Sequence, residues 1–202
     1  MRQEIKSTND NNLVHLILGL GNPGAQYELT RHNVGFLVLD ALTEKHNIRL
    51  DTNGYYCLYG KGTIGGHEIV AAKPMTYMNE SGKAAKAILS ALDILPEQAI
   101  VVHDDIDLPL GKIKRKHSGG DAGQLGIRSI INRLATDQFT RVRIGIGRPE
   151  HQEDIVDFVL SPFAVDDFPM VKKVQEQAIE LIETTLAEFN EKPKKSEEDT
   201  GC

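Results

Sequence analysis

The chain of 202 residues has little cysteine and no long apolar run. Its two cysteines, Cys57 and Cys202, are too few and too far apart for a disulfide framework or a four-ligand zinc site. No segment approaches the ~18 apolar residues of a membrane helix, and the polar first dozen residues lack the apolar core of a signal peptide. We therefore expect a soluble protein of the reducing cytoplasm with no membrane partner.

Positive charge is also scarce, since the formal net charge is -6 at pH 7. Net charge sets the long-range field that a polyanion meets on approach, so any contact with nucleic acid must be local. With 40% hydrophobic and 26% charged residues, a chain of this length fits one α/β domain. We assign residues 13–190 to that domain, 1–12 to a polar extension and 191–202 to a charged, disordered tail.

Short apolar runs alternate with segments of helical periodicity along the chain. Strands are expected at 13–19, 99–103, 111–117 and 141–147, and a hairpin over 56–64 and 67–72 that turns at Gly65-Gly66. Helices are expected at 34–46, 80–92, 124–134 and 165–190, the last interrupted near its start by Pro169. This alternation predicts a single α/β domain built on a twisted, mixed and mostly parallel sheet flanked by helices.

The segment 19–24, Gly-Leu-Gly-Asn-Pro-Gly, follows the first predicted strand and matches the G-x-G-x-x-G pattern of dinucleotide-binding folds. In those folds a helix begins within the glycine turn, so that its amides meet the pyrophosphate. In this chain the next predicted helix starts about ten residues after Gly24. The glycines are therefore better interpreted as a tight turn than as a cofactor site, and we expect no cofactor.

Four separated blocks stand out along the chain: GLGNPGAQYELTRHNVGF, KPMTYMNESG, VVHDDIDLPLGKIKRK and RVRIGIGRP. In sequence and in order they resemble the bacterial-type peptidyl-tRNA hydrolase family, and the resemblance spans about residues 13–185. It implies a phosphorylase/hydrolase-like fold and hydrolysis of the ester between a peptide and the 3′ ribose of tRNA. It also implies a monomer that needs no metal and binds the CCA end and acceptor stem of peptidyl-tRNA.

Ester hydrolysis needs a base that activates water, and His32 at the end of the glycine-rich loop suits this role. A carboxylate that accepts the other imidazole N–H would fix its tautomer, and Asp104 and Asp105 both end a predicted strand. Strand alternation puts these two on opposite faces, so only one can point at His32. The family motif selects Asp104. The other six histidines are interpreted as ordinary core or surface residues.

Two asparagines match the family's binding-site positions, Asn22 and Asn79. A carboxamide can both donate to and accept from an ester and its peptide units, and we expect Asn79 to polarise the scissile carbonyl. The alternatives are structural: a turn former for Asn22 and a helix N-cap for Asn79. Tyr27 and Met78 match cleft-lining positions of the family, although either residue alone would be interpreted as core.

Lys112 to His117 form a local basic run in an acidic chain. Alternation puts Lys112, Lys114 and Lys116 on one face of the predicted strand. Such a patch suits tRNA phosphates, and the family match singles out Lys114, Lys116 and Arg143 for this contact. The alternative is an edge strand protected by lysines.

The chain departs from the family after this basic run. There the family has a His-Asn pair that opens a helix, and its asparagine position falls on Leu125. Either Gln124 supplies the missing donor or this wall of the cleft is built differently. The departure leaves open an RNA-binding relative without turnover, although the matched base, carboxylate and asparagines argue against it.

Other sites find little support in the sequence. The sequence contains no G-x-S-x-G, P-loop or H-E-x-x-H motif, so it does not support a serine hydrolase, a P-loop NTPase or a zinc protease. Asp104, Asp105 and Asp107 are clustered carboxylates of the kind that bind hard cations. We prefer the interpretation in which one of them orients His32 and the others cap the backbone or face solvent.

Overall fold

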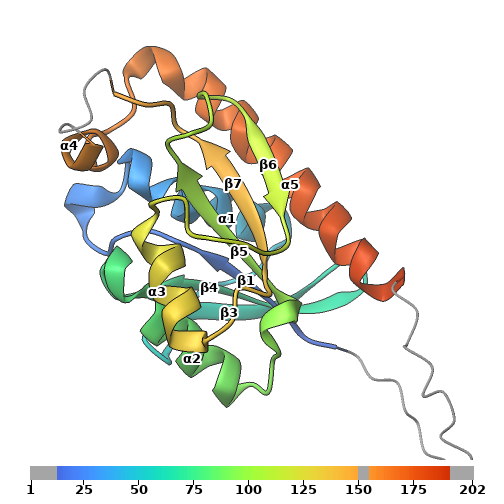
Figure 1. Ribbon diagram of the computed structural model, residues 1–202. Coiled ribbons are helices and arrows are strands. Elements are labelled where there is room, and N and C mark those ends of the chain that lie inside the picture. The colour runs from blue at the N-terminus through green and yellow to red at the C-terminus, as the bar shows by residue number, and fades with distance from the viewer. Residues whose placement is uncertain (1–12, 150–154, 192–202) are drawn as a thin grey trace, which may run out of the picture.

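The structure is a computed structural model that describes residues 13–149 and 155–191 (Figure 1). The strands are β1 (His15–Gly19), β2 (Thr52–Gly54), β3 (Cys57–Ile64), β4 (His67–Pro74), β5 (Ala99–Asp105), β6 (Ile113–Lys116) and β7 (Thr140–Gly145). The α-helices are α1 (Val34–Lys45), α2 (Ser81–Ala91), α3 (Leu125–Leu134), α4 (Ile155–Leu160) and α5 (Phe168–Glu191). Three short 3-10 helices bear on the site: η1 (Ala25–Tyr27), η2 (Arg31–Asn33) and η3 (Met78–Glu80). The expectations for residues 1–12 and 192–202 lie outside the described residues.

The described strands form one sheet in the order β2-β3-β4-β1-β5-β7-β6. Strand β1 pairs in parallel with both β4 and β5, and β5 pairs in parallel with β7. Strands β3 and β6 are antiparallel to their neighbours. The prediction of a mixed, mostly parallel sheet flanked by helices is therefore confirmed.

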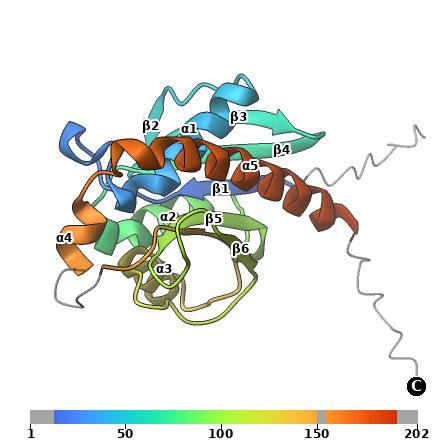
Figure 2. The ribbon, with the colours of Figure 1, turned by 90° about the horizontal axis from the view of Figure 1, so that it is seen from above.

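Helices cover both faces of the sheet, as the view from above shows (Figure 2). Side chains of β1 alternate between two cores: Ile17 belongs to the core under α1 and α5, and Leu16 and Leu18 to the core under α2 and α3. Strand β5 does the same, with Val102 facing α1 and Val101 facing α3. Because both faces are buried, the central strands are continuous apolar runs.

Most predicted elements are present, with differences at their ends. Gly65 and Gly66 both have positive φ and turn the β3–β4 hairpin as expected. The interruption expected at Pro169 is wrong: α5 begins one residue earlier, and proline is tolerated in the first turn, where its missing N–H has no partner to lose. Two short elements, β2 and α4, were not predicted. In the described residues no helix is long and apolar enough to cross a membrane.

The site lies at the carboxyl ends of β1 and β5, which pair side by side. The helices that come after these strands, α1 and α3, cover opposite faces of the sheet, so the chain switches face at this point. The carboxyl ends of strands at such a switch point are the usual binding region of α/β proteins. Close packing of α1 brings its first turn to this point. A Cβ on Gly35 would lie 2.4 Å from the Val102 carbonyl oxygen of β5, so only glycine fits there.

Candidate active site

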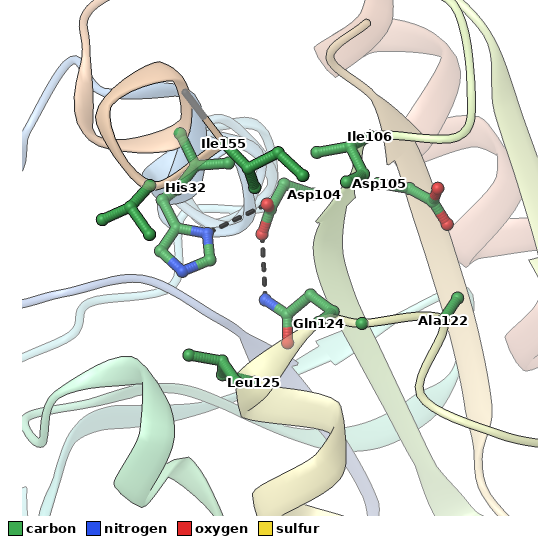
Figure 3. Close-up of a pocket in the computed structure, with 11 residues that line it drawn as sticks. His32, Asp104, Asp105, Ile106, Ala122, Gln124, Leu125 and Ile155 are labelled. Carbon is green, nitrogen blue, oxygen red and sulfur yellow. Dashed lines mark hydrogen bonds and ion pairs between the residues drawn. The ribbon is translucent and has the colours of Figure 1, made fainter. Parts of the chain in front are cut away.

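A buried histidine and a buried aspartate form the centre of the site. His32 lies in η2, directly before α1, and Asp104 is on β5. The imidazole Nδ1 of His32 is 2.9 Å from Asp104 Oδ2, and both side chains are buried (Figure 3). Asp105 points away from His32 and pairs with Arg143 (Figure 3). The structure thus brings His32 and Asp104 together, and strand alternation accounts for the choice between the two aspartates.

The second oxygen of Asp104 is bound by Gln124. Gln124 Nε2 donates to Asp104 Oδ1 at 2.9 Å, so the carboxylate lies between His32 and Gln124 (Figure 3). The other end of the same carboxamide caps α3, because Gln124 Oε1 accepts a hydrogen bond from the Ile127 N–H at 2.8 Å. Gln124 therefore fixes the start of α3 relative to the carboxylate.

The two titratable groups of the pair shift each other's pKa in opposite directions. Burial by itself would lower the pKa of His32, but the charge of Asp104 and the hydrogen bond to it outweigh burial and raise that pKa. Burial would raise the pKa of Asp104, but His32 and the hydrogen bond from Gln124 outweigh burial and lower it. Asp104 is thus held as a carboxylate, which requires Nδ1 of His32 to carry the proton and leaves Nε2 as the basic nitrogen.

A cavity of about 240 Å³ opens beside this pair. Its polar lining consists of His32, Asp104, Asp105 and Gln124. The rest of its lining is glycine or apolar: Ile106, Ala122, Gly123 and Leu125, with Ile155, Val156 and Val159 of α4. A histidine poised to act as a base therefore borders a hollow large enough for part of a small substrate.

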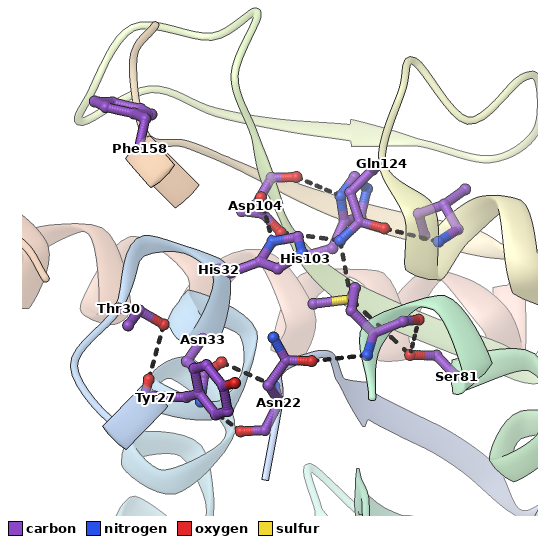
Figure 4. Close-up of polar contacts among 12 residues, drawn as sticks. Asn22, Tyr27, Thr30, His32, Asn33, Ser81, His103, Asp104, Gln124 and Phe158 are labelled. Carbon is purple, nitrogen blue, oxygen red and sulfur yellow. Dashed lines mark hydrogen bonds and ion pairs between the residues drawn. The ribbon is translucent and has the colours of Figure 1, made fainter. Parts of the chain in front are cut away.

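Asn22 is held in a network that joins the glycine-rich loop to η3 (Figure 4). Its Oδ1 accepts a hydrogen bond from the Met78 N–H at 2.8 Å. The side chain of Asn33 accepts from the Asn22 N–H and donates to the Asn22 carbonyl oxygen, at 2.8 and 2.9 Å. With its oxygen occupied, the Asn22 carboxamide keeps its N–H donors for other partners.

None of the predicted substrate-binding residues, Asn22 included, is among those that line the cavity. Met78 is buried in the core under α2 and α3, with its sulfur 3.2 Å from Gln124 Nε2. Tyr27 is half-buried in η1. Asn79 is exposed in η3, and within the described part of the chain its carboxamide forms no hydrogen bond. The helix N-cap considered for Asn79 is wrong, because α2 begins at Ser81 and Glu80 is its N-cap.

The predicted phosphate-binding residues share one face of the sheet. Lys114 pairs in register with Arg143, and the exposed Lys114 and Lys116 alternate with Ile113 and Arg115 along β6. Arg115 points the other way and forms an ion pair with Glu188 of α5 at 2.8 Å. Because β6 is the last strand of the sheet, protection of an edge by lysines remains an alternative reason for this pattern.

Two of the three clustered aspartates have arginine partners. Arg143 Nε donates to Asp105 Oδ2 at 2.6 Å, so Arg143 already has an internal partner. Asp107 forms an ion pair with Arg148. Within residues 13–149 and 155–191 no group of three histidine, cysteine, aspartate or glutamate side chains is placed to hold a metal ion.

Sequence reasoning missed Asn33, the Asp104 contact of Gln124, and α4. Asn33 directly follows His32, and an asparagine before a predicted helix signals only an N-cap. Residues 155–160 are too short for helical periodicity to stand out. Gln124 stands in the histidine position of the family's His-Asn pair, and this match was the one sequence signal that Gln124 belongs to the site.

The chain is similar over most of its length to known proteins of one family. The family model described as peptidyl-tRNA hydrolase matches residues 16–200. The chain is 42% identical to the peptidyl-tRNA hydrolase of Bacillus subtilis, over 85% of this chain and 92% of the relative. It is 44% identical to that of Aquifex aeolicus, over 84% and 88%.

Solved structures give the same result. A peptidyl-tRNA hydrolase in complex with N-propanol superposes with a TM-score of 0.82 at 34% identity, covering 88% of this chain and 90% of that one. The Acinetobacter baumannii enzyme superposes with a TM-score of 0.81 at 33% identity, over 89% and 92%. The chain therefore belongs to the peptidyl-tRNA hydrolase family.

Proposed function

We propose that the protein hydrolyses the ester between a peptide and the 3′-terminal ribose of peptidyl-tRNA, with His32 as the general base. The observation that carries this proposal is the buried His32–Asp104 hydrogen bond beside an open cavity, in a chain of this family. Proton transfer to a positioned base of this kind typically contributes about 10²- to 10⁴-fold to the reaction rate.

In the proposed reaction, Nε2 of His32 takes a proton from a water molecule as its oxygen attacks the ester carbonyl carbon. Asp104 keeps Nδ1 protonated and stabilises the imidazolium that forms. The carbon–oxygen bond to the ribose then breaks, and the leaving 3′ oxygen takes the proton from His32. The products are a peptide with a free carboxylate and an intact tRNA, with no covalent intermediate.

The developing oxyanion needs a hydrogen-bond donor, and Asn79 supplies it in this proposal. Asn79 has an exposed carboxamide with no internal hydrogen bond in the described residues. Asn22 keeps its side-chain N–H donors because only its oxygen is bound by Met78. We assign Asn79 to the carbonyl, and Asn22 with Tyr27 to positioning of the substrate. Met78, which was predicted to line the cleft, is buried in the core and instead holds Asn22 through its backbone N–H.

The tRNA body binds through Lys114 and Lys116 in this scheme. Both side chains are exposed on one face of β6, which makes them accessible to phosphates. Arg143 contributes a weaker contact, since Asp105 shares its guanidinium. The protein acts as a monomer in the cytoplasm, without metal or cofactor.

The test is release of N-acetylated amino acid from N-acetyl-aminoacyl-tRNA by the purified protein. The reaction is run with a chelator present, and unblocked aminoacyl-tRNA is the comparison substrate. Release in the presence of chelator supports the proposal. Tight tRNA binding without release would refute it in favour of an RNA-binding protein without turnover.

A further inference from the structure

The cavity beside His32 has an apolar wall that comes from three separate parts of the chain. Ile106 follows β5, Leu125 begins α3, and Ile155, Val156 and Val159 belong to α4. Leu125 and Val156 are 46% and 64% exposed. Exposed apolar side chains that gather around a hollow mark a binding surface.

The polar side chains of the same cavity are occupied by one another or by the backbone. Asp104 is bound through one oxygen by His32 and through the other by Gln124. Asp105 accepts from the Asp107 N–H and from Arg143, one bond at each oxygen. Gln124 uses its oxygen to cap α3. Among the polar side-chain atoms of this lining, Nε2 of His32 has no hydrogen-bond partner within the described residues.

This distribution favours an aliphatic occupant over a nucleobase. The edge of a base carries several donors and acceptors, and burial without partners would cost each of them free energy. An aliphatic side chain leaves nothing unpaired, and the wall of leucine, isoleucine and valine removes its surface from water. A cavity of about 240 Å³ accommodates one large side chain.

We propose that this pocket binds the side chain of the amino acid esterified to tRNA, and that Leu125 makes the protein prefer a large apolar residue there. The inference rests on the proposed function. If water activated by His32 attacks the ester carbonyl, the Cα next to that carbonyl lies one bond away, and its side chain reaches the pocket that His32 and Leu125 both line. An asparagine at position 125 would instead present a carboxamide to this side chain.

The experiment compares three substrates on one tRNA body, charged with N-acetyl-leucine, N-acetyl-asparagine or N-acetyl-alanine. Leucine and asparagine have nearly the same shape, so their ratio isolates polarity, and alanine tests the filling of the pocket. Each kcat/KM is divided by the spontaneous hydrolysis rate of the same ester. We expect the leucine ester to exceed each of the others by about tenfold, the usual discrimination of an apolar pocket.

Two variants connect this preference to Leu125. Leu125→Asn should reduce the leucine-to-asparagine ratio to about one, because it replaces apolar wall with a polar group. Leu95→Asn is the matched control. Leu95 is also an exposed leucine, but it lies before the amino end of β5, whereas the cavity lies at the carboxyl end of that strand. We expect Leu95→Asn to keep the wild-type ratio.

The outcomes separate this inference from the proposed function. A leucine preference that Leu125→Asn removes and Leu95→Asn retains supports the pocket assignment. Equal hydrolysis of all three esters by the wild-type protein overturns the pocket assignment and leaves the proposed function standing. A preference that persists in Leu125→Asn also overturns it. Failure of the wild-type protein to hydrolyse any ester overturns the proposed function, and the inference with it.

Discussion

Replacing Gln124 by methionine, a side chain of similar size, removes two strong buried hydrogen bonds, to Asp104 and from Ile127, along with the weak contact to the Met78 sulfur. Gln124 is 8% exposed, so water does not easily replace its partners. Loss of the N-cap to Ile127 costs about 1 kcal/mol. Loss of the bond to the Asp104 carboxylate costs about 1.5–3 kcal/mol, the range for hydrogen bonds to charged groups. We therefore expect Gln124→Met to lower the free energy of unfolding by about 2.5–4 kcal/mol.

Gln124→Glu separates the two contributions. The introduced carboxylate still accepts the hydrogen bond from Ile127, so the cap remains. At neutral pH the variant loses the donor to Asp104 and places a second carboxylate beside the first, which raises the pKa of the introduced side chain in the folded protein. A carboxyl group whose pKa is raised on folding stabilises the folded state at a pH below its pKa in the unfolded chain, about 4.3, and this stabilisation is lost as the pH rises through the folded pKa. The deficit of Gln124→Glu relative to wild type should thus shrink on acidification.

Urea denaturation measured at pH 7 and at pH 5 provides the assay. The slope of free energy against urea should not change between variants, so that shifts in midpoint report stability. If Gln124→Met lowers the free energy of unfolding by less than about 1 kcal/mol, the buried Gln124 side chain does not form both the bond to Asp104 and the bond from Ile127. A deficit of Gln124→Glu that is constant with pH would refute the contact with Asp104.

Three further predictions follow from charged or titratable groups. Because Asp104 raises the pKa of His32, kcat/KM should fall on acidification with a midpoint above about 6.5, and Asp104→Asn should move that midpoint down; an unmoved midpoint would contradict the pairing. Substituting both Lys114 and Lys116 by alanine should reduce the salt dependence of tRNA binding by about one unit of slope per lost phosphate contact, and an unchanged slope would remove them from the interface. His15 is buried with a lowered pKa, so the unfolded chain binds protons that the folded one does not, and stability should fall below about pH 6.5. His15→Phe should weaken that acid dependence in urea midpoints measured at two pH values.

Periodicity in the sequence was enough to predict the main elements of the fold. The central strands are apolar runs closed by glycine or aspartate, and the helices repeat apolar residues at helical spacing. Strand β2 has only three residues, with two exposed and one half-buried, so no burial pattern distinguishes it. Helix α4 has six residues, fewer than two full turns, which is too short for a periodic signal.

The site was predictable where a local rule applied. Strand alternation left one aspartate facing His32, and the family motif selected Asp104. No local rule gives the spatial partner of a buried carboxamide, so the Asp104 contact of Gln124 and the Asn22 contacts of Asn33 emerged only from the structure. The apolar wall of the cavity could not be predicted either, because Leu125 and α4 lie about thirty residues apart in sequence and come together only in the fold.

The central claim is that His32 is the base, and the single-turnover rate of His32→Asn tests it most directly. Excess enzyme is mixed with N-acetyl-aminoacyl-tRNA, and the Kd for tRNA and the urea midpoint are measured on the same preparation. We expect the rate to fall by at least about a hundredfold, the lower limit of general base catalysis, with tRNA binding and folding close to wild type. A folded, tRNA-binding His32→Asn protein that hydrolyses the ester at close to the wild-type rate would contradict the account.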